Sequence, residues 1–110
     1  MAFNASAAFV LPRHIRVKDG VEARGITETT TLTYRSSQYQ ILTLTAGSPL
    51  TCMLPSAKNG AYFWIKNSSS SNAALNINEP SGGATITTAA IGEGCLIVSD
   101  GSSWYEVIKA

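Results

Sequence analysis

Short stretches rich in β-branched and aromatic residues recur about every ten residues from Thr29 to Ile108, and glycine, proline, asparagine or serine separates them. No apolar stretch keeps a helical period over its length, so the chain predicts no convincing helix. Many short strands joined by such turns are typical of a sandwich or a barrel. We therefore predict an all-β fold, a small antiparallel β-sandwich or jelly-roll-like barrel of about eight short strands.

Residues 60–67, Gly-Ala-Tyr-Phe-Trp-Ile-Lys-Asn, give the clearest strand signal and predict a central strand. Successive side chains of a strand point to opposite faces. The residues expected in the core are Ala61, Phe63 and Ile65. The residues expected on the other face are Tyr62, Trp64 and Lys66. Two large aromatic rings on one face are expected to contact a second layer or another subunit, or to lie at a rim that faces water. What this face contacts is therefore the functional question.

The strongest hairpin signal is Asp100-Gly101-Ser102-Ser103, which separates two apolar strands at residues 94–99 and 104–108. The first of these strands is almost wholly apolar, so we expect it to be buried on both faces. The Asp100 side chain is expected to accept hydrogen bonds from backbone N–H groups of the turn. The hairpin places Trp104 near the end of the sheet.

Only 14% of the 110 residues are charged, against about 25% in a typical soluble domain. This composition indicates a single domain whose surface is largely covered by other proteins, although plain secreted β-domains share it. The net charge of +1 does not support a bulk attraction to nucleic acid or to a membrane surface. No apolar run is long enough to span a membrane, and no basic residue precedes the short apolar start, so we expect no signal peptide.

The charges that are present gather near the N-terminus, where residues 1–24 hold four of the eight basic residues. Isolated aromatics such as Phe3 and Phe9 have little to bury against within such a segment. We therefore predict an N-terminal arm or edge strand over residues 1–28 that docks on a partner, and a β-sandwich domain over residues 29–110. An ordinary first strand with a frayed end remains the alternative.

The sequence offers no catalytic, metal or cofactor site that we can assemble. His14 is the only histidine, and neither Cys52 nor Cys95 has a histidine or cysteine at ligand spacing. Buried reduced thiols are expected for both cysteines, with a disulfide between them left open. A pair of catalytic carboxylates in a small hydrolase is the one enzymatic alternative, and we expect no enzyme.

Three segments carry a resemblance to a known family. They are Gly60 to Asn67 as quoted, Leu75-Asn76-Ile77, and Ser99-Asp-Gly-Ser-Ser-Trp-Tyr-Glu-Val107. Together they resemble the small β-domains of tailed-phage virion structural proteins, of the capsid decoration (cement), head-fibre or tail-fibre type. The similarity covers residues 40–108. It implies a bacteriophage structural protein without cofactor or chemistry, which forms a symmetric homotrimer.

By this resemblance the chain is expected in the virion, on the outer capsid surface, after synthesis in the host cytoplasm. There it would bridge neighbouring copies of the phage major capsid protein and stabilise the assembled shell. The expected capsid-docking residues of the arm are Phe3, Phe9, Arg13, Arg16 and Lys18. The expected subunit-interface residues are Tyr62, Trp64 and Trp104.

A receptor-binding or glycan-binding module of a tail fibre or baseplate is the alternative. In that case Trp104 and Tyr105 would stack on a sugar ring of a glycan receptor. The competing interpretation of these two residues is that they cover the open end of the sandwich.

Overall fold

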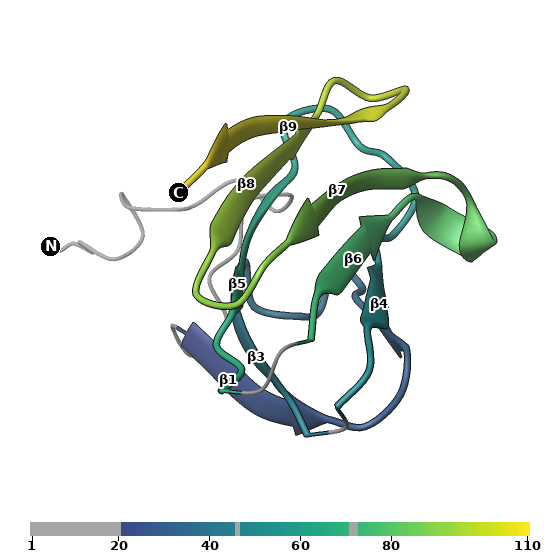
Figure 1. The fold of residues 1–110 in the computed structure, drawn as a ribbon. Helices are drawn as coiled ribbons and strands as arrows, with labels where there is room; N and C mark the ends of the chain where they lie inside the picture. The colour runs from purple at the N-terminus through teal and green to yellow at the C-terminus, as the bar shows by residue number, and fades with distance from the viewer. Residues whose placement is uncertain (1–20, 46, 71–72) are drawn as a thin grey trace, which may run out of the picture.

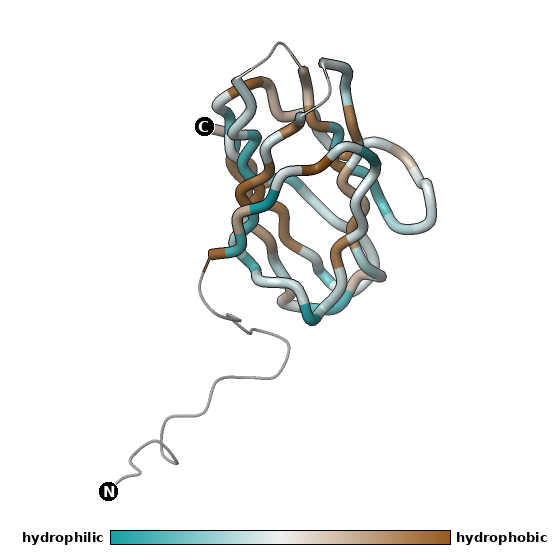
Figure 2. The backbone as a smooth tube through the Cα atoms, turned by 90° about the horizontal axis from the view of Figure 1, so that it is seen from below, coloured by the Kyte–Doolittle hydropathy of each residue, from teal (hydrophilic) through white to brown (hydrophobic). Residues whose placement is uncertain are grey.

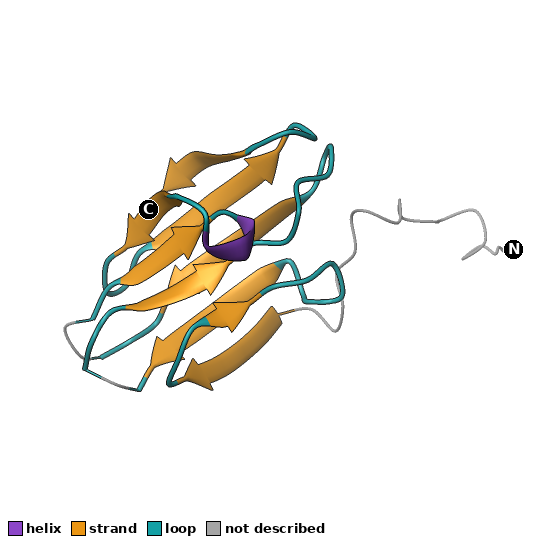
Figure 3. Cartoon of the chain, turned by 90° about the vertical axis from the view of Figure 1, so that its right-hand side faces the viewer, coloured by secondary structure: helices purple, strands orange, loops and turns teal. Residues whose placement is uncertain are grey.

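The computed structural model describes residues 21–45, 47–70 and 73–110, which form nine strands and one 3₁₀ turn (Figure 1). The strands are β1 (Val21–Ile26), β2 (Thr30–Thr31), β3 (Tyr39–Leu44), β4 (Leu50–Met53), β5 (Tyr62–Asn67), β6 (Leu75–Asn78), β7 (Thr85–Ala89), β8 (Gly94–Ser99) and β9 (Trp104–Lys109), and the turn is η1 (Pro80–Gly82). They form a five-stranded sheet in the order β1-β3-β5-β8-β9 and a four-stranded sheet in the order β2-β4-β6-β7. The two sheets share one core, and the axes of their strands are nearly aligned (Figure 3). The predicted small all-β sandwich is confirmed.

The strand pairing differs from the predicted antiparallel sandwich, because both sheets are mixed. Strands β1, β3 and β5 pair in parallel in one sheet, and β2, β4 and β6 pair in parallel in the other. From β1 to β6 the chain alternates between the sheets, so it winds through three coils, β1–β2, β3–β4 and β5–β6. The physical reason is that the loops after these strands cross to the facing sheet instead of folding back as hairpins.

Each strand of the third coil pairs with a strand of the second coil, and the paired residues are separated by the same number of positions in both sheets. Tyr39 pairs with Trp64 in one sheet and Leu50 pairs with Leu75 in the other, a shift of 25 residues in each case. The chain therefore contains a structural repeat that the sequence did not reveal. Antiparallel strands β7, β8 and β9 then close one end of the stack.

The core lies between the sheets and is built from the inward side of each alternating strand. Ala61, Phe63 and Ile65 are all buried, as predicted. Figure 2 shows hydrophobic and hydrophilic residues following one another along the strands. At the centre, the Phe63 ring lies 6.4 Å from that of Tyr34 and 5.9 Å from that of Trp104, measured between ring centroids. These aromatic contacts add to the area that the sandwich buries.

Strand β8 is buried on one face only, which corrects the expectation that both of its faces are covered. Its inward residues Cys95, Ile97 and Ser99 are buried, whereas Leu96 and Val98 on the outer face are half-buried. Among the described elements, none forms a layer over the outer face of the five-stranded sheet. An apolar strand in this position therefore leaves apolar side chains on the surface.

Strands β8 and β9 form the predicted hairpin. The Asp100 carboxylate accepts hydrogen bonds from the backbone N–H groups of Ser102 and Ser103 at 2.8 and 2.9 Å, as expected from the sequence. Gly101 has φ of 101°, a conformation that a residue with a side chain rarely adopts. These hydrogen bonds hold the pKa of Asp100 below its ordinary value of 3.8.

The stability of the hairpin should therefore depend on pH in the acidic range. A carboxyl group with a lowered pKa in the folded state contributes its full stability above the unfolded value near 3.8, and loses it as the pH falls through the folded value. We expect the thermal midpoint of Asp100→Asn, which keeps a neutral acceptor, to change less between pH 5 and pH 2.5 than that of the wild type. Equal changes in the two proteins would contradict this role of Asp100.

The described sandwich begins inside the range predicted as arm or edge strand. Strand β1 is the edge of the five-stranded sheet and pairs in parallel with β3 from Val21↔Tyr39 to Ile26↔Leu44. Residues 1–20, which make up the rest of that range, lie outside the described residues. The sequence-based expectation of a docking arm thus concerns residues that precede β1.

Candidate interaction surface

The outer face of the five-stranded sheet carries a continuous row of apolar side chains, one from each strand. Strand pairing aligns Val21, Tyr39, Trp64, Leu96 and Ile108 across the whole sheet, and we call these five residues the apolar row. Its two ends are open, with Val21 54% and Ile108 45% exposed, and its middle three members are half-buried. A contiguous exposed apolar patch is more often part of an interaction surface than the rest of a protein surface is.

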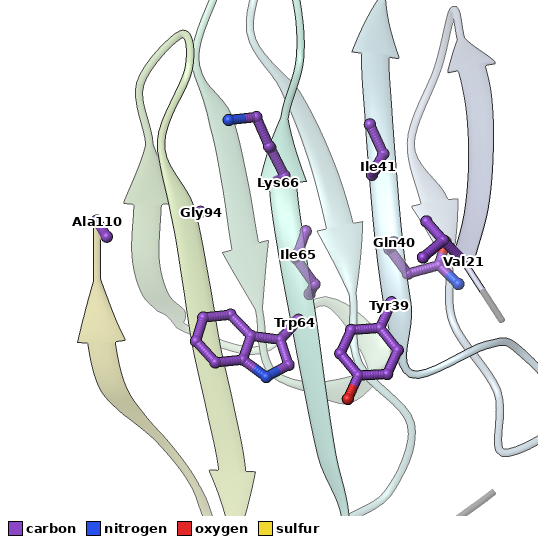
Figure 4. A pocket seen from close by; sticks show the side chains of 9 residues that line it. All are labelled: Val21, Tyr39, Gln40, Ile41, Trp64, Ile65, Lys66, Gly94 and Ala110. Atoms are coloured by element: carbon purple, nitrogen blue, oxygen red, sulfur yellow. The ribbon is translucent and has the colours of Figure 1, made fainter. Parts of the chain in front are cut away.

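A shallow hollow of about 450 Å³ opens on this face over β1, β3 and β5, and Gly94 at the start of β8 and Ala110 complete its lining. Figure 4 shows the rings of Tyr39 and Trp64 on neighbouring strands, with Val21 on the strand beyond Tyr39. Ile41 lines the same hollow from the next outward position of β3. The outward side chains of the neighbouring strands β1, β3 and β5 thus give the hollow an aromatic and aliphatic lining, which suits an apolar group of a partner.

Among the described residues that line this hollow, Lys66 is the only one with a charged side chain. Its amine donates a hydrogen bond to the Gly92 carbonyl oxygen at 3.1 Å. The ammonium group is therefore held at the loop before β8, and its aliphatic stem remains beside the hollow.

Tyr62 extends the aromatic surface beyond the hollow on β5. Burial raises the pKa of Tyr62 above its ordinary value of 10, and a side-chain hydrogen bond with Tyr39 raises it further. On β8 and β9, Val98 and Tyr105 continue the line of Tyr62 across the sheet. The sequence-predicted interface residues Tyr62 and Trp64 therefore lie on one accessible face, two positions apart.

Trp104 lies on the opposite side of the sheet and is 3% exposed. Its indole Nε1 donates a hydrogen bond to the Pro55 carbonyl oxygen at 2.8 Å, and its ring packs against Phe63. It is therefore not accessible to a second subunit, which corrects the prediction that Trp104 lies at a subunit contact. The reason is strand alternation, which turns Trp104 inward and leaves the next residue, Tyr105, 51% exposed on the outside.

A polar cluster that sequence reasoning missed lies on the inner side of β1. Buried Gln40 donates hydrogen bonds from Nε2 to Glu22 Oε1 and to the Ser37 carbonyl oxygen, both at 2.7 Å. Arg24 donates from Nη2 to Gln40 Oε1 at 3.4 Å, and its Nε lies 3.8 Å from Glu22 Oε2. The cluster gives the β1 edge of the core a polar border. The signal was Glu22 and Arg24 on one face of β1, with Glu22 opposite Gln40 and Arg24 opposite Leu42 on β3, and it is readable only once the strand pairing is known.

The five residues expected to dock on a capsid lie outside the described residues. They are Phe3, Phe9, Arg13, Arg16 and Lys18. The structure therefore brings together Tyr62 and Trp64 from the sequence-predicted set, and adds Val21, Tyr39, Leu96 and Ile108 to them. The sequence placed Tyr39, Leu96 and Ile108 in strands and Val21 in the range of the arm or edge strand, and assigned none of them to an interface.

Both cysteines are buried and free, the form expected from the sequence. Burial raises the pKa of the Cys52 thiol to about 12, and burial also raises that of Cys95. Thiols in this state are poor nucleophiles at neutral pH. Within residues 21–45, 47–70 and 73–110, no group of three or more histidine, cysteine, aspartate or glutamate side chains lies close enough to hold a metal ion.

The described part of the chain also contains no helix that is long and apolar enough to cross a membrane. In comparisons with protein-family models, with curated proteins and with solved structures, the chain matches none of them. The candidate surface therefore has to be interpreted from its own geometry and from the motifs in the sequence.

Proposed function

We propose that this chain is a non-enzymatic structural protein of a tailed-phage virion, a decoration protein that binds the outside of the assembled capsid as a homo-oligomer. The sequence motifs that resemble such proteins motivate the assignment to a phage. The single structural observation that supports a binding role is the apolar row, which spans all five strands on the outer face of one sheet.

The proposed subunit contact is centred on Tyr62 and includes Leu96 and Ile108 of the apolar row, with Trp64 at its border. Aromatic side chains provide much of the energy of protein interfaces, and these two are already held in place by neighbouring strands. A trimer assembled in this way presents three identical N-terminal arms to the shell. Three linked weak contacts hold a trimer far more tightly than one contact would, because the second and third bind at a high effective concentration.

The arm supplies the contact with the capsid in this proposal. Its bases Arg13, Arg16 and Lys18 would pair with acidic groups of the major capsid protein, and Phe3 would enter an apolar site between capsid subunits. Binding to the assembled shell, and not to free capsid subunits, stabilises the shell by mass action.

The geometry of β9 disfavours the glycan-binding alternative. Its platform required Trp104 and Tyr105 to stack together on one sugar ring. These side chains lie on opposite faces of β9, one in the core and one at the surface.

The proposal is tested by light scattering of the purified chain, followed by co-sedimentation with expanded empty capsids. We expect a trimer that sediments with capsids. Tyr62→Lys should give a folded monomer, because a charge at the centre of the contact would be buried without a partner. The matched control Thr51→Lys, on the outward side of β4 in the other sheet, should remain trimeric.

Charge reversal in the arm separates the two contacts. The triple variant Arg13→Glu, Arg16→Glu and Lys18→Glu should stay trimeric and lose at least about tenfold in capsid affinity at 0.1 M salt. A wild-type chain that is a monodisperse monomer and ignores capsids would refute the proposed function.

A further inference from the structure

The hollow between Val21, Tyr39 and Trp64 opens at the point where the described chain begins. Val21 is both the first residue of β1 and part of the lining, so the described chain starts at the rim of the hollow. Val21 remains more than half exposed although it stands on an apolar surface. The segment best placed to cover this surface is therefore the chain that leads into β1.

The preceding twenty residues contain a group of apolar side chains suited to the hollow. Phe9-Val10-Leu11 are three consecutive apolar residues, and the proline at position 12 favours an extended backbone before it. An aromatic and two branched aliphatic side chains match a lining made of an indole, a phenol ring and aliphatic groups.

The connecting length allows this contact. Residues 12–20 separate Leu11 from Val21, and an extended chain covers about 3.3 Å per residue, so the connection reaches roughly 30 Å. Trp64 lies two strands from Val21, about 10 Å away at the usual spacing of neighbouring strands. The segment can therefore turn back over the sheet and lie across β1, β3 and β5 with length to spare.

We propose that residues 9–11 of the chain bind in its own hollow, over Val21, Tyr39 and Trp64. A tether this short gives the segment an effective concentration of about 1 mM at the hollow. Neighbouring copies at micromolar concentration supply about a thousandfold less, so the chain's own segment occupies the site first. An apolar contact with an intrinsic dissociation constant below about 1 mM is then more than half formed.

This inference does not rest on the proposed function, because a chain that never meets a capsid would cover its hollow in the same way. It does assign Phe9 to the hollow, whereas the sequence alone suggested that Phe9 contacts the shell. Phe3 and the bases Arg13, Arg16 and Lys18 remain available to a capsid, with the bases on the connection between the bound segment and β1.

Limited trypsin digestion of the full chain tests the inference, since the three bases provide cleavage sites within that connection. A connection held at both ends is cleaved more slowly than a released one, so the cleavage rate rises with the released fraction. We expect cleavage at these sites, measured by mass spectrometry, to be about fivefold faster in Trp64→Thr and in Phe9→Ser than in the wild type.

Two matched controls accompany these variants. Phe3→Ser makes the same chemical change six residues earlier, and Tyr105→Thr removes an aromatic ring from the same sheet face outside the hollow. Both should be cleaved at the wild-type rate. Because Phe9 does not belong to the described sandwich, Phe9→Ser keeps the test valid even if Trp64→Thr folds poorly.

Equal cleavage rates in the wild type and Phe9→Ser would overturn the inference. Protection that disappears on dilution from 100 to 1 μM would also overturn it, by showing that a neighbouring copy supplies the segment. Protection that is independent of concentration and lost in Phe9→Ser, with Phe3→Ser unchanged, is the result we expect. The digestion is read without capsids, so a failure of the proposed function does not affect it.

Discussion

Replacing Trp104 with alanine should lower the free energy of unfolding by about 4 kcal/mol, the typical cost of removing a buried tryptophan side chain. The ring lies between the sheets against Phe63, and its Nε1 hydrogen bond satisfies the Pro55 carbonyl oxygen. Trp104→Ala would leave both a cavity and an unpaired acceptor. Small domains are stable by only about 5–15 kcal/mol, so a large fraction of the variant could unfold at 37 °C. Urea unfolding at 25 °C measures the loss.

The other tryptophan of the chain supplies the matched control. Trp64→Ala makes the same substitution on the outer face of β5, where the side chain is half-buried and faces the hollow. We expect it to cost about 1 kcal/mol or less, which is typical of partly exposed positions. Similar losses in the two variants would contradict the placement of one tryptophan in the core and the other at the surface.

The second large effect is expected at Asn67, a fully buried side chain that joins three segments. Its Nδ2 donates to the carbonyl oxygens of Ala73 and Ala89 at 3.0 Å, and its Oδ1 accepts from the backbone N–H and the hydroxyl group of Ser69. Asn67→Asp keeps the shape but places a carboxylate oxygen against two carbonyl oxygens. We expect a loss of about 3 kcal/mol or more at pH 7, because a charge is buried facing acceptors.

The pH dependence of this variant identifies the cause. Burial and the two carbonyl oxygens facing Oδ2 raise the folded-state pKa of the new carboxyl group above its unfolded value near 3.9, and they outweigh the lowering effect of the two Ser69 donors at Oδ1. Protonation therefore favours the folded state. The loss should therefore be largest at neutral pH and shrink as the pH falls toward 4. Asn76→Asp is the control, since Asn76 Oδ1 already accepts a hydrogen bond from the Thr88 hydroxyl group, and an aspartate can do the same. Equal losses in the two variants would refute this account.

The sequence predicted those parts of the fold that depend on neighbouring residues. Alternation along residues 60–67 separated Phe63 from Tyr62 and Trp64 correctly, because a strand has only two faces. The Asp100-Gly101 turn was equally readable, since its hydrogen bonds lie within four residues. Local chemistry thus determined the face of most residues and the hairpin at the end of the chain.

Pairing between distant strands was not readable in the same way. Short loops that cross to a facing sheet look like hairpin loops in the sequence, so the three parallel coils were taken for an antiparallel sandwich. The structural repeat at an offset of 25 residues could not be recognised in the sequence, because the inward side chains that it aligns differ in polarity. Leu42 pairs with Asn67, an aliphatic residue beside a hydrogen-bonding hub.

Trp104 was misplaced for a related reason. Paired strands share the same inward face. Because β8 was expected to be buried on both faces, its sequence did not indicate which face of its partner β9 points into the core. In the structure Trp104 pairs with buried Ser99, and Tyr105 pairs with half-buried Val98 on the outer face. The apolar row was missed because it joins five strands that lie far apart in the sequence.

The stacked coils have a consequence for how such a molecule can vary in size. Strands β7, β8 and β9 end the stack on one side by antiparallel pairing, whereas the parallel-paired β1 and β2 are its edge strands on the other side. Each further coil would pair in parallel with the coil before it in both sheets. The stack can therefore lengthen by about 4.8 Å per coil without any change in the antiparallel strands at its other end. Coils would then be gained or lost during evolution on the N-terminal side, while the C-terminal β8–β9 hairpin stays unchanged.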